Sequence, residues 1–386
     1  MKKFLPYGHQ CVEKDDIKAV VEVLKGDWLT QGPKVAEFEK KVAQYCGVEY
    51  AVAVSSGTAA LSAAYLAAAL SAGDEVITTP LTFAATSNAL VHCGGAPVFV
   101  DVEEETLNIN PELIEKAITK KTKAIAVVDF AGHPCDLDKI KAIAKKHKLL
   151  IIEDAAHSLG AMYKDRMVGS MADLTTLSFH PVKLITTGEG GMVLTSRKDF
   201  YEKMLVMRHH GIVKKPAKGL WYYEIETPGH NFRLTDIQCA LGISQLKKIY
   251  RFLTRRRQIA KKYQTAFSGL NEIILPTEKP YAKSAWHIFP IQFNLEKLKI
   301  RRKEIFEKLR EQGLGVQVHY VPLHLQPFYQ KKFGYKKGDF PVAETYYERA
   351  ITLPLFPQMT ALDIQFVIKA VKAVYAEIIN PNSRRK

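Results

Sequence analysis

Short apolar runs alternate with helical patterns between residues 51 and 154, and this rhythm constrains the fold more than any other feature of the chain. The runs AIAVV at 124–128 and LLII at 149–152 contain no polar residue, which is typical of strands that are buried on both faces. Strands that alternate with helices at this spacing form a parallel sheet with a helix in each crossover. The sequence therefore predicts an α/β fold with a mostly parallel sheet flanked by helices.

The remaining elements follow from the spacing of the apolar residues. We expect helices at 14–25, 34–46, 59–70, 83–93, 111–118, 137–146, 199–208, 234–248 and 251–266, and strands at 51–54, 75–79, 97–100, 124–128, 149–152, 175–177 and 192–195. A polar, aromatic segment at 209–232 has no predicted element.

The character of the chain changes beyond about residue 270. Strand patterns at 286–293, 315–320 and 351–353 are mixed there with helical patterns at 301–311, 342–349 and 361–376. The sequence thus predicts a large domain over residues 1–248 and a smaller C-terminal α+β domain over residues 249–386.

Three polar turns follow predicted strands and should meet at one edge of the sheet. They lie at 55–58, 153–157 and 178–183. Ligands of parallel α/β sheets bind outside the carboxyl ends of the strands, so this convergence indicates a ligand site.

The turn Ser-Ser-Gly-Thr at 55–58 stands between a predicted strand and an alanine-rich helix. Free backbone N–H groups at a helix N-terminus favour a phosphate, and Gly57 lets the backbone approach it closely. An ordinary helix cap is an equally good interpretation, because serine and threonine are preferred at that position.

Three further residues suit a flat cationic ring. Asp154 ends the run LLIIED, and a carboxylate there needs a cation, which the protonated ring nitrogen of a cofactor would supply; the alternative is a cap of the next segment. His157 can face the same space. Phe83 follows the run VITTPLT and can stack on such a ring, although on its own it is better interpreted as a core aromatic.

Lys183 stands between the apolar residues Val182 and Leu184 in the turn that follows Ser178. Desolvation disfavours the charged amine and makes it a better nucleophile for a carbonyl group. Taken alone, Lys183 is more simply interpreted as a lysine that extends to solvent.

Together these residues form the set that pyridoxal 5′-phosphate requires. A lysine bonds to the aldehyde of that cofactor, a carboxylate keeps the ring nitrogen protonated, an aromatic side chain stacks on the ring and a turn binds the phosphate. The joint pattern is far more specific than any of its parts.

Composition excludes several other classes. The chain is 47% hydrophobic and 25% charged, so disorder is not expected. The net charge of +15 comes largely from basic runs such as 255–257 and 384–386, which are better interpreted as solvated faces than as a nucleic-acid surface. Five scattered cysteines without a CxxC pair argue against disulfides and zinc and for a reducing compartment; we expect no metal.

Residues 51–73 carry no charge, but the turn at 55–58 interrupts them and the remainder is shorter than the ~20 residues of a membrane span. The first residues, MKKFLP, lack the apolar segment of a signal peptide. We therefore expect a soluble, cytoplasmic protein with no membrane contact.

At this point the chain resembles the sugar-nucleotide aminotransferases of the DegT/DnrJ/EryC1/StrS family, from about residue 5 to about residue 376. The matching segments are LTQGPKVAEFE (29–39), SSGTAAL (55–61), DEVITTPLTFAATSNA (74–89), IIEDAAHSLG (151–160), LSFHPVKLITTGEGG (177–191) and GHNFRLTDIQCALGISQL (229–246). Within the family it is most similar to the 4-aminotransferases of pseudaminic acid biosynthesis, on PYGHQ (6–10), SFHPVK (178–183) and VQVHYVPLHLQPFY (316–329). Lys183 stands where a dehydratase branch carries histidine, which argues against a 3-dehydratase.

The resemblance implies a fold-type I pyridoxal-phosphate enzyme that works as a homodimer with shared active sites. By the same resemblance, Lys183 is the Schiff-base lysine, Asp154 the partner of the pyridine nitrogen, His157 a neighbour of the ring and Phe83 the stacking aromatic.

The resemblance also implies contacts to the phosphate and the sugar nucleotide. Gly57, Thr58 and Ser178 would contact the cofactor phosphate, and Asn231 would reach the cofactor phosphate or the substrate of the neighbouring subunit. Substrate contacts are implied for Tyr7, Trp28, Leu29, Thr30, Ser56, Ser178, Asn231, Gln317, Val318, His319 and Tyr320.

The implied reaction is transfer of the amino group of L-glutamate to the C4 keto group of UDP-2-acetamido-2,6-dideoxy-β-L-arabino-hexos-4-ulose. The product would be UDP-4-amino-4,6-dideoxy-N-acetyl-β-L-altrosamine. Another nucleotide-linked 4-keto sugar, of the bacillosamine or perosamine type, is an alternative acceptor. The alternative of another class is a regulator or scaffold that binds pyridoxal phosphate.

Overall fold

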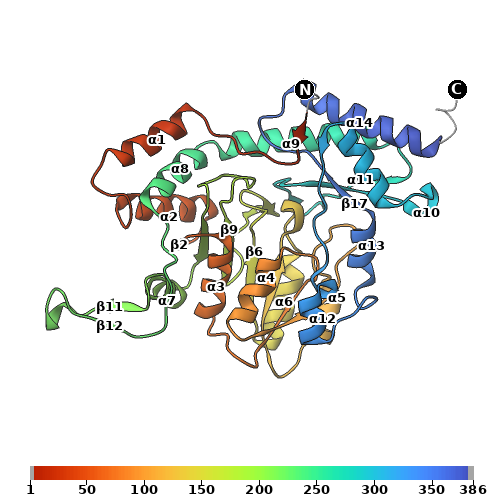
Figure 1. Cartoon of the computed structure of the whole chain (residues 1–386). Helices are drawn as coiled ribbons and strands as arrows, with labels where there is room; N and C mark the ends of the chain where they lie inside the picture. The colour runs from red at the N-terminus through yellow and green to blue at the C-terminus, as the bar shows by residue number, and fades with distance from the viewer. Residues whose placement is uncertain (1–3, 381–386) are drawn as a thin grey trace.

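The structure is a computed structural model that describes residues 4–380. Its centre is a seven-stranded sheet with the strand order β2-β10-β9-β6-β5-β3-β4 (Figure 1). The strands are β2 (Tyr50–Val54), β3 (Glu75–Thr78), β4 (Ala96–Phe99), β5 (Thr122–Val128), β6 (Leu150–Asp154), β9 (Leu174–Ser178) and β10 (Gly191–Thr195). Strand β10 is antiparallel to both neighbours and every other pair is parallel, which confirms the predicted mostly parallel sheet.

Both faces of this sheet are buried under helices. Alternate residues of a strand point to opposite faces, so Val52 and Val54 pack with one group of helices and Ala51 and Ala53 pack with another. The first face is covered by α3 (Gly57–Ala67), α4 (Ala84–His92) and α7 (Lys198–Arg208), and the second by α2 (Pro33–Cys46), α6 (Leu137–His147) and α8 (Asp236–Leu246). The uniformly apolar strands are explained by this double cover.

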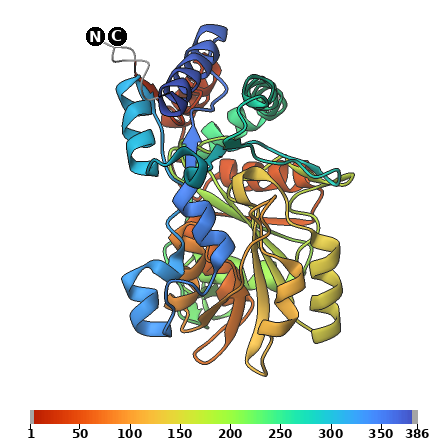
Figure 2. The same cartoon turned by 90° about the vertical axis from the view of Figure 1, so that its right-hand side faces the viewer.

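The C-terminal part has its own three-stranded antiparallel sheet, in which β15 (Phe289–Phe293) lies between β13 (Ile273–Ile274) and β17 (Ala350–Leu353). Figure 2 shows its helices gathered above the central sheet, with two further helices running down beside it. The helices of this part are α9 (Ile249–Phe267), α10 (Leu295–Leu298), α11 (Arg302–Glu311), α12 (Pro327–Phe333), α13 (Pro341–Arg349) and α14 (Ala361–Ile379).

Helix α9 connects the two hydrophobic cores. Its first turns place Phe252 and Leu253 in the core under α2 and α8, while Tyr263 and Phe267 belong to the C-terminal core. Leu5, in the short strand β1 (Leu5–Pro6), joins that C-terminal core as well, because β1 pairs with β16 (Leu314–Gly315). The division of the chain at residue 248 stays a prediction.

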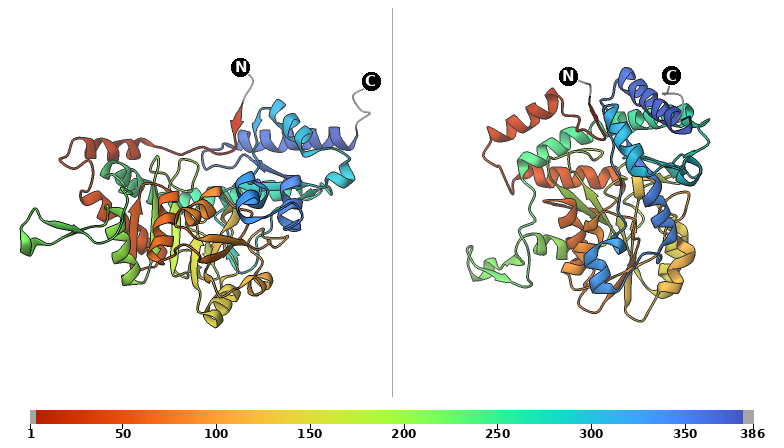
Figure 3. Two further views of the ribbon diagram at one scale, coloured as in Figure 1. Left: turned by 60° about the horizontal axis from the view of Figure 1, so that its bottom comes forward. Right: turned by 45° about the vertical axis from the view of Figure 1, so that its right-hand side comes forward.

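The structure differs from the prediction in three segments. The segment 209–232 contains a hairpin of β11 (Ile212–Lys214) and β12 (Tyr223–Ile225) that projects from the body (Figure 3); its exposed three-residue strands leave no burial pattern to detect. The predicted strand at 315–320 is wrong, since only β16 and an isolated bridge from Gln317 to Thr352 are paired there. The predicted helix at 111–118 is a short α5 (Pro111–Ile114) followed by a 3₁₀ turn.

Several short elements are absent from the prediction. They include α10, α12, β1, β13, a 3₁₀ turn at Leu323–Leu325, and a small sheet of β7 (Met162–Tyr163), β8 (Arg166–Met167) and β14 (Ala282–Lys283). Helix α1 (Lys14–Leu24) and the other long helices lie within a few residues of their predicted bounds. None of the helices within residues 4–380 has the length and apolar character needed to cross a membrane.

Candidate active site

Three turns meet at the carboxyl edge of the central sheet. Gly191 at the start of β10 is paired with Val54 of β2 on one side and with Ser178 of β9 on the other. Asp154 at the end of β6 is paired with Thr176 of β9. The predicted convergence of the turns at 55–58, 153–157 and 178–183 is therefore confirmed.

A pocket of about 700 Å³ opens at this edge. Most of the residues that the sequence predicted for the site line it, namely Tyr7, Ser56, Gly57, Thr58, Phe83, Asp154, His157, Ser178, Lys183, Gln317, Val318, His319 and Tyr320. The segment 317–320 comes from the C-terminal part, so the pocket lies between the central sheet and that part.

The first turn of α3 forms one wall of the pocket. Ser56 is the N-cap of this helix and accepts a hydrogen bond from the N–H of Ala59 at 3.1 Å. A Cβ atom on Gly57 would lie only 2.9 Å from Cβ of Ser178, so a glycine is needed for the two turns to lie against each other. Ser56 is therefore an ordinary helix cap, as one of the two interpretations of this turn predicts. The N-terminus of α3 also faces the pocket, and a phosphate is favoured at such a position.

Asp154 is a buried carboxylate held by two donors. The hydroxyl of Thr86 donates to Oδ2 at 2.6 Å, and the N–H of Ala156 donates to Oδ1 at 3.2 Å. Burial raises the pKa of Asp154, whereas both hydrogen bonds and the nearby Lys183 lower it. A buried carboxylate that faces an open pocket suits a cationic ligand.

Lys183 lines the pocket rather than the outer surface of the protein. Burial lowers the pKa of its amine to about 8, and only the charge of Asp154 opposes this shift. The interpretation as a lysine that extends to solvent is therefore wrong. A large share of this amine is neutral near pH 8, which is the form that attacks a carbonyl.

Aromatic and imidazole rings complete the site. Phe83 is 58% exposed and its ring lies 5.9 Å from that of Tyr320, so it is a pocket residue and not a core aromatic. Nε2 of His157 lies 3.1 Å from the hydroxyl of Tyr320, and the ring of His287 lies 4.3 Å from that of His157. Burial lowers the pKa of His157 far below its ordinary value, so this ring is neutral.

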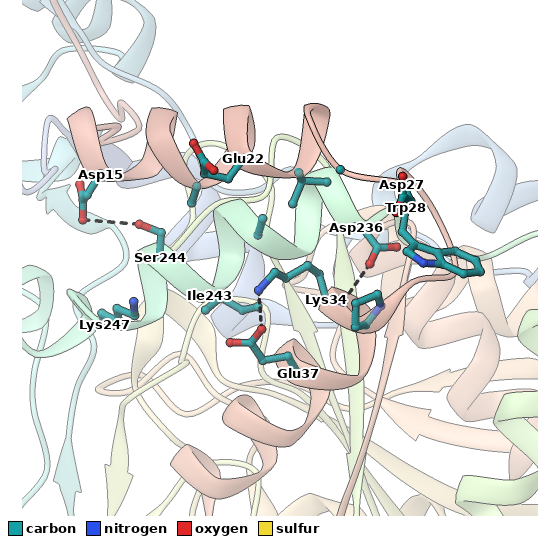
Figure 4. A pocket seen from close by; sticks show the side chains of 15 residues that line it. Asp15, Glu22, Asp27, Trp28, Lys34, Glu37, Asp236, Ile243, Ser244 and Lys247 are labelled. Carbon is teal, nitrogen blue, oxygen red and sulfur yellow. Dashed lines mark hydrogen bonds and ion pairs between the residues drawn. The ribbon is translucent and has the colours of Figure 1, made fainter.

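Four predicted substrate residues lie outside this pocket of their own chain. Trp28 lines a separate hollow between α1, α2 and α8, beside Asp27 and Asp236 (Figure 4). Leu29 is 47% exposed, and Thr30 and Asn231 form isolated bridges with Thr235 and His209. A single chain does not bring these four residues to the pocket.

The sequence reasoning missed other residues at the site. Thr82 and His287 line the pocket. Thr86 does not line it but donates a hydrogen bond to Asp154. Thr82 and Thr86 flank Phe83 in the segment LTFAAT, so the hydroxyls beside the predicted stacking residue were an available signal. No such signal marks His287, which stands in a segment predicted as a strand.

The residues at the pocket fit pyridoxal phosphate. The close turn at Gly57 matches the phosphate. The buried carboxylate of Asp154 matches the ring nitrogen, and the amine of Lys183, with its lowered pKa, matches the aldehyde. Nδ1 of His157 is buried and without a hydrogen-bond partner among the described residues, as expected beside a polar ligand. Within residues 4–380, no group of three or more His, Cys, Asp and Glu side chains is arranged to hold a metal ion.

Fold and site together define a pyridoxal-phosphate-dependent aminotransferase of the α/β class. The model of the DegT/DnrJ/EryC1/StrS aminotransferase family matches residues 10–372, and the chain belongs to this family. It is a sugar aminotransferase, whose substrates are a nucleotide-linked keto sugar and an amino donor.

Three similar proteins illustrate the match. The spore coat polysaccharide biosynthesis protein SpsC of Bacillus subtilis is 44% identical over 377 residues, which cover 96% of this chain and 97% of SpsC. The structure of Helicobacter pylori PseC, an aminotransferase of pseudaminic acid biosynthesis, is similar with a TM-score of 0.92 and 35% identity, covering 97% of this chain and 100% of that one. The pyridoxal-phosphate form of the putative sugar aminotransferase Spr1654 from Streptococcus pneumoniae gives a TM-score of 0.91 at 31% identity, covering 97% and 99%.

Proposed function

We propose that the enzyme transfers the amino group of L-glutamate to the C4 keto group of UDP-2-acetamido-2,6-dideoxy-β-L-arabino-hexos-4-ulose. The product is UDP-4-amino-4,6-dideoxy-N-acetyl-β-L-altrosamine, an intermediate of pseudaminic acid biosynthesis. One observation carries the proposal: the segment 317–320, part of the stretch that resembles the pseudaminic branch, lines the same pocket as Lys183. The likeness to PseC supports it.

In this proposal the chain holds the cofactor through four kinds of contact. Gly57, Thr58 and Ser178 bind the phosphate, Asp154 binds the ring nitrogen and Phe83 covers the ring beside His157. Bound pyridoxal phosphate supplies a carbonyl for amine exchange and a protonated ring that withdraws electrons.

Lys183 has two tasks in the proposed reaction. It holds the cofactor covalently between turnovers, and its freed Nζ then acts as the general base that moves the proton from the α-carbon of the donor. The lowered pKa of Lys183, about 8, suits a base that works near neutral pH.

The sugar nucleotide is proposed to contact Tyr7, Ser56 and the segment 317–320. His319 packs against Tyr7 with 5.2 Å between the ring centres, and its Nδ1 lies 2.9 Å from the hydroxyl of Thr352. Burial lowers the pKa of His319 to about 4, so it offers a neutral ring nitrogen to the sugar hydroxyls.

We also propose a homodimer with shared active sites. Lys183 is the sole lysine or arginine among the described residues that line the pocket, whereas a UDP-sugar and glutamate carry negative charge. Asn231 would complete the site of the partner subunit, and Trp28, Leu29 and Thr30 would contact the substrate across the dimer. The proposed domains are residues 1–248, which hold the cofactor, and residues 249–386.

The proposed location is the cytoplasm. The five cysteines form no disulfide within the described residues, as is usual for a chain in a reducing compartment.

The acceptor is tested by incubating the purified enzyme with L-glutamate and a panel of UDP-linked 4-keto sugars. NMR of the product should identify the 4-amino sugar of the altro configuration, formed with a higher kcat/KM than from any other acceptor. Turnover restricted to a different 4-keto sugar would replace the proposed substrate and leave the chemistry of the site intact.

A second acceptor class is favoured by one observation. The identity to SpsC, a protein of spore coat polysaccharide biosynthesis, is 44%, against 35% for PseC. This higher identity to a protein of another polysaccharide pathway supports a different nucleotide-linked 4-keto sugar as the alternative acceptor, and the same panel includes the bacillosamine and perosamine types.

A further inference from the structure

Two threonine hydroxyls lead to the carboxylate of Asp154. Oγ1 of Thr82 lies 2.8 Å from Oγ1 of Thr86, which donates to Oδ2 of Asp154 at 2.6 Å. Both threonines are 1% exposed and Asp154 is 6% exposed, so water does not compete for these bonds.

The direction of this pair of hydrogen bonds follows from the count of protons. A threonine hydroxyl has a single proton, and that of Thr86 goes to Asp154. The oxygen of Thr86 must therefore accept from Thr82. Hydrogen bonds in such a chain polarise one another, and a charged acceptor at the end strengthens both.

The backbone fixes this arrangement. Phe83 is the N-cap of α4, so Thr82 and Thr86 flank the first turn of that helix. The hydroxyl of Tyr65 donates to the carbonyl of Thr86 at 2.8 Å, which anchors the turn. Because threonine is branched at Cβ, its side chain has few rotamers, and the donor stays aimed at Asp154.

We propose that Thr82 and Thr86 form a hydroxyl relay that holds Asp154 ionised, and that Thr86 is thereby a positioning residue for the proton shared by Asp154 and the cofactor ring nitrogen. The inference rests on the proposed role of Asp154. Each donor to the carboxylate makes it a weaker base, so the shared proton rests on the ring. There it increases the electron-withdrawing power on which the chemistry depends.

The burial of Asp154 makes this relay necessary. Desolvation raises the pKa of the carboxyl, and the hydrogen bond from Thr86 is the largest of the effects that lower it. Without Thr86, a single backbone N–H and the charge of Lys183 oppose desolvation.

The test uses the holoenzyme loaded with pyridoxal phosphate that carries nitrogen-15 in the ring. The nitrogen shift should report a protonated ring in the wild type, a shift toward the neutral ring in Thr86→Val, and recovery in Thr86→Ser. The dissociation constant of the cofactor should rise about tenfold or more in Thr86→Val, since it loses a hydrogen bond to a charged group. Thr82→Val, which removes the first donor alone, should shift the signal in the same direction by less.

Thr78→Val is the matched control. It removes a buried threonine hydroxyl that has no hydrogen-bond partner among the described residues, Asp154 included, so the nitrogen shift should stay at the wild-type value. The inference is overturned if Thr86→Val and Thr82→Val, both folded by thermal melting, keep the wild-type shift, or if Thr86→Ser behaves as Thr86→Val does.

Asp154→Asn distinguishes a failure of this inference from a failure of the proposed role of Asp154 as the partner of the ring nitrogen. A ring that stays protonated in Asp154→Asn removes the proposed role of Asp154 and the relay together. A ring that loses its proton in Asp154→Asn but keeps it in Thr86→Val removes the relay alone.

Discussion

The chemistry of single residues in this pocket is set by their surroundings. Asp154 is buried and Lys183 is half-buried at the pocket, and the loss of water around them disfavours the charged form of each. Each charge favours the ionised form of the other, which limits both pKa shifts. The result is an amine that is readily neutral beside a carboxylate that can hold a cation.

Lys183→Ala tests the residue on which the chemistry depends. Transamination should fall by about 1,000-fold or more, because the covalent anchor and the general base are lost together. The visible absorbance of the covalently held cofactor should disappear at the same time. A Lys183→Ala protein that still turns over at the wild-type rate would exclude the proposed mechanism. Slow turnover without the absorbance would be consistent with the mechanism.

The pKa of Lys183 gives a pH dependence. The amine attacks in its neutral form, so the rate at which the apoenzyme captures pyridoxal phosphate should rise with pH and level off above about pH 8. Below that value the rate should fall about tenfold per pH unit, since the neutral fraction does. Stopped-flow absorbance measures this rate, and a flat profile between pH 6 and pH 9 would contradict the lowered pKa.

Glu153 is a second buried carboxyl, on the opposite face of the strand from Asp154. Burial raises the pKa of Glu153 to about 8, and its Oε2 accepts from the hydroxyl of Thr175 at 2.8 Å. The folded state thus binds the proton more tightly than the unfolded state does, and this stabilisation is present at low pH and lost as the pH rises through about 8. Between pH 5 and pH 8 the free energy of unfolding should therefore fall less in Glu153→Gln than in the wild type, as measured by urea unfolding at each pH. Equal pH slopes in the two proteins would show that Glu153 does not titrate in this range.

At the scale of the element, the first turn of α3 decides whether a phosphate fits. Ser56 caps the helix with its side chain, and Gly57 brings the turn against Ser178. The turn follows β2, whose Val54 pairs with Gly191 of β10, and Gly191 also pairs with Ser178 of β9. The sheet therefore holds the turns at 55–58 and 178–183 close to each other.

Gly57→Ala should weaken cofactor binding about tenfold or more. The added Cβ would lie 2.9 Å from Cβ and 3.0 Å from Oγ of Ser178, and relieving such an overlap costs about 1–3 kcal/mol. Fluorescence titration of the apoenzyme with pyridoxal phosphate measures the effect. Gly269→Ala is the control, since nothing lies within 4 Å of its added Cβ; equal affinities in the two variants would contradict the close approach at Gly57.

At the scale of the whole molecule, the pocket contains residues from distant parts of the chain. Tyr7 follows β1, the segment 317–320 follows β16, and these two strands pair in parallel. The hairpin of β11 and β12 extends away from the body and exposes Leu220 and Trp221 by 92% and 79% (Figure 1). A two-stranded hairpin is marginally stable alone, which fits the proposed dimer.

Mixing two impaired variants tests the shared site. Lys183→Ala lacks the base, and Asn231→Ala should lower activity by at least about tenfold if Asn231 reaches the site of the partner subunit. After mixing and re-association, about half of the dimers are mixed and each has one intact site, so activity should recover to about a quarter of the wild-type value. No recovery, with dimers shown to have exchanged by mass spectrometry, would place Asn231 in the site of its own chain or outside both.

Much of the fold was predictable because its signals are local. Apolar runs of four or five residues between helical patterns define the parallel strands, and the polar turns that follow them mark the carboxyl edge. The hairpin at 212–225 was missed because exposed strands lack alternating burial. The predicted strand at 315–320 was wrong because residues 317–320 line the pocket, and apart from β16 only an isolated bridge from Gln317 to Thr352 is paired there.

By itself, the sequence determined the α/β fold and the core of the site, the turn at 55–58 with Asp154 and Lys183. These positions depend on the order of strands and turns along the chain, which is written in the local pattern. The tertiary structure alone decided that Tyr320 meets His157, that Thr86 donates to Asp154, and that Trp28 and Asn231 lie away from the pocket of their own chain. Such contacts join residues far apart in sequence, and they depend on how helices rotate and pack against the sheet, which no local pattern encodes.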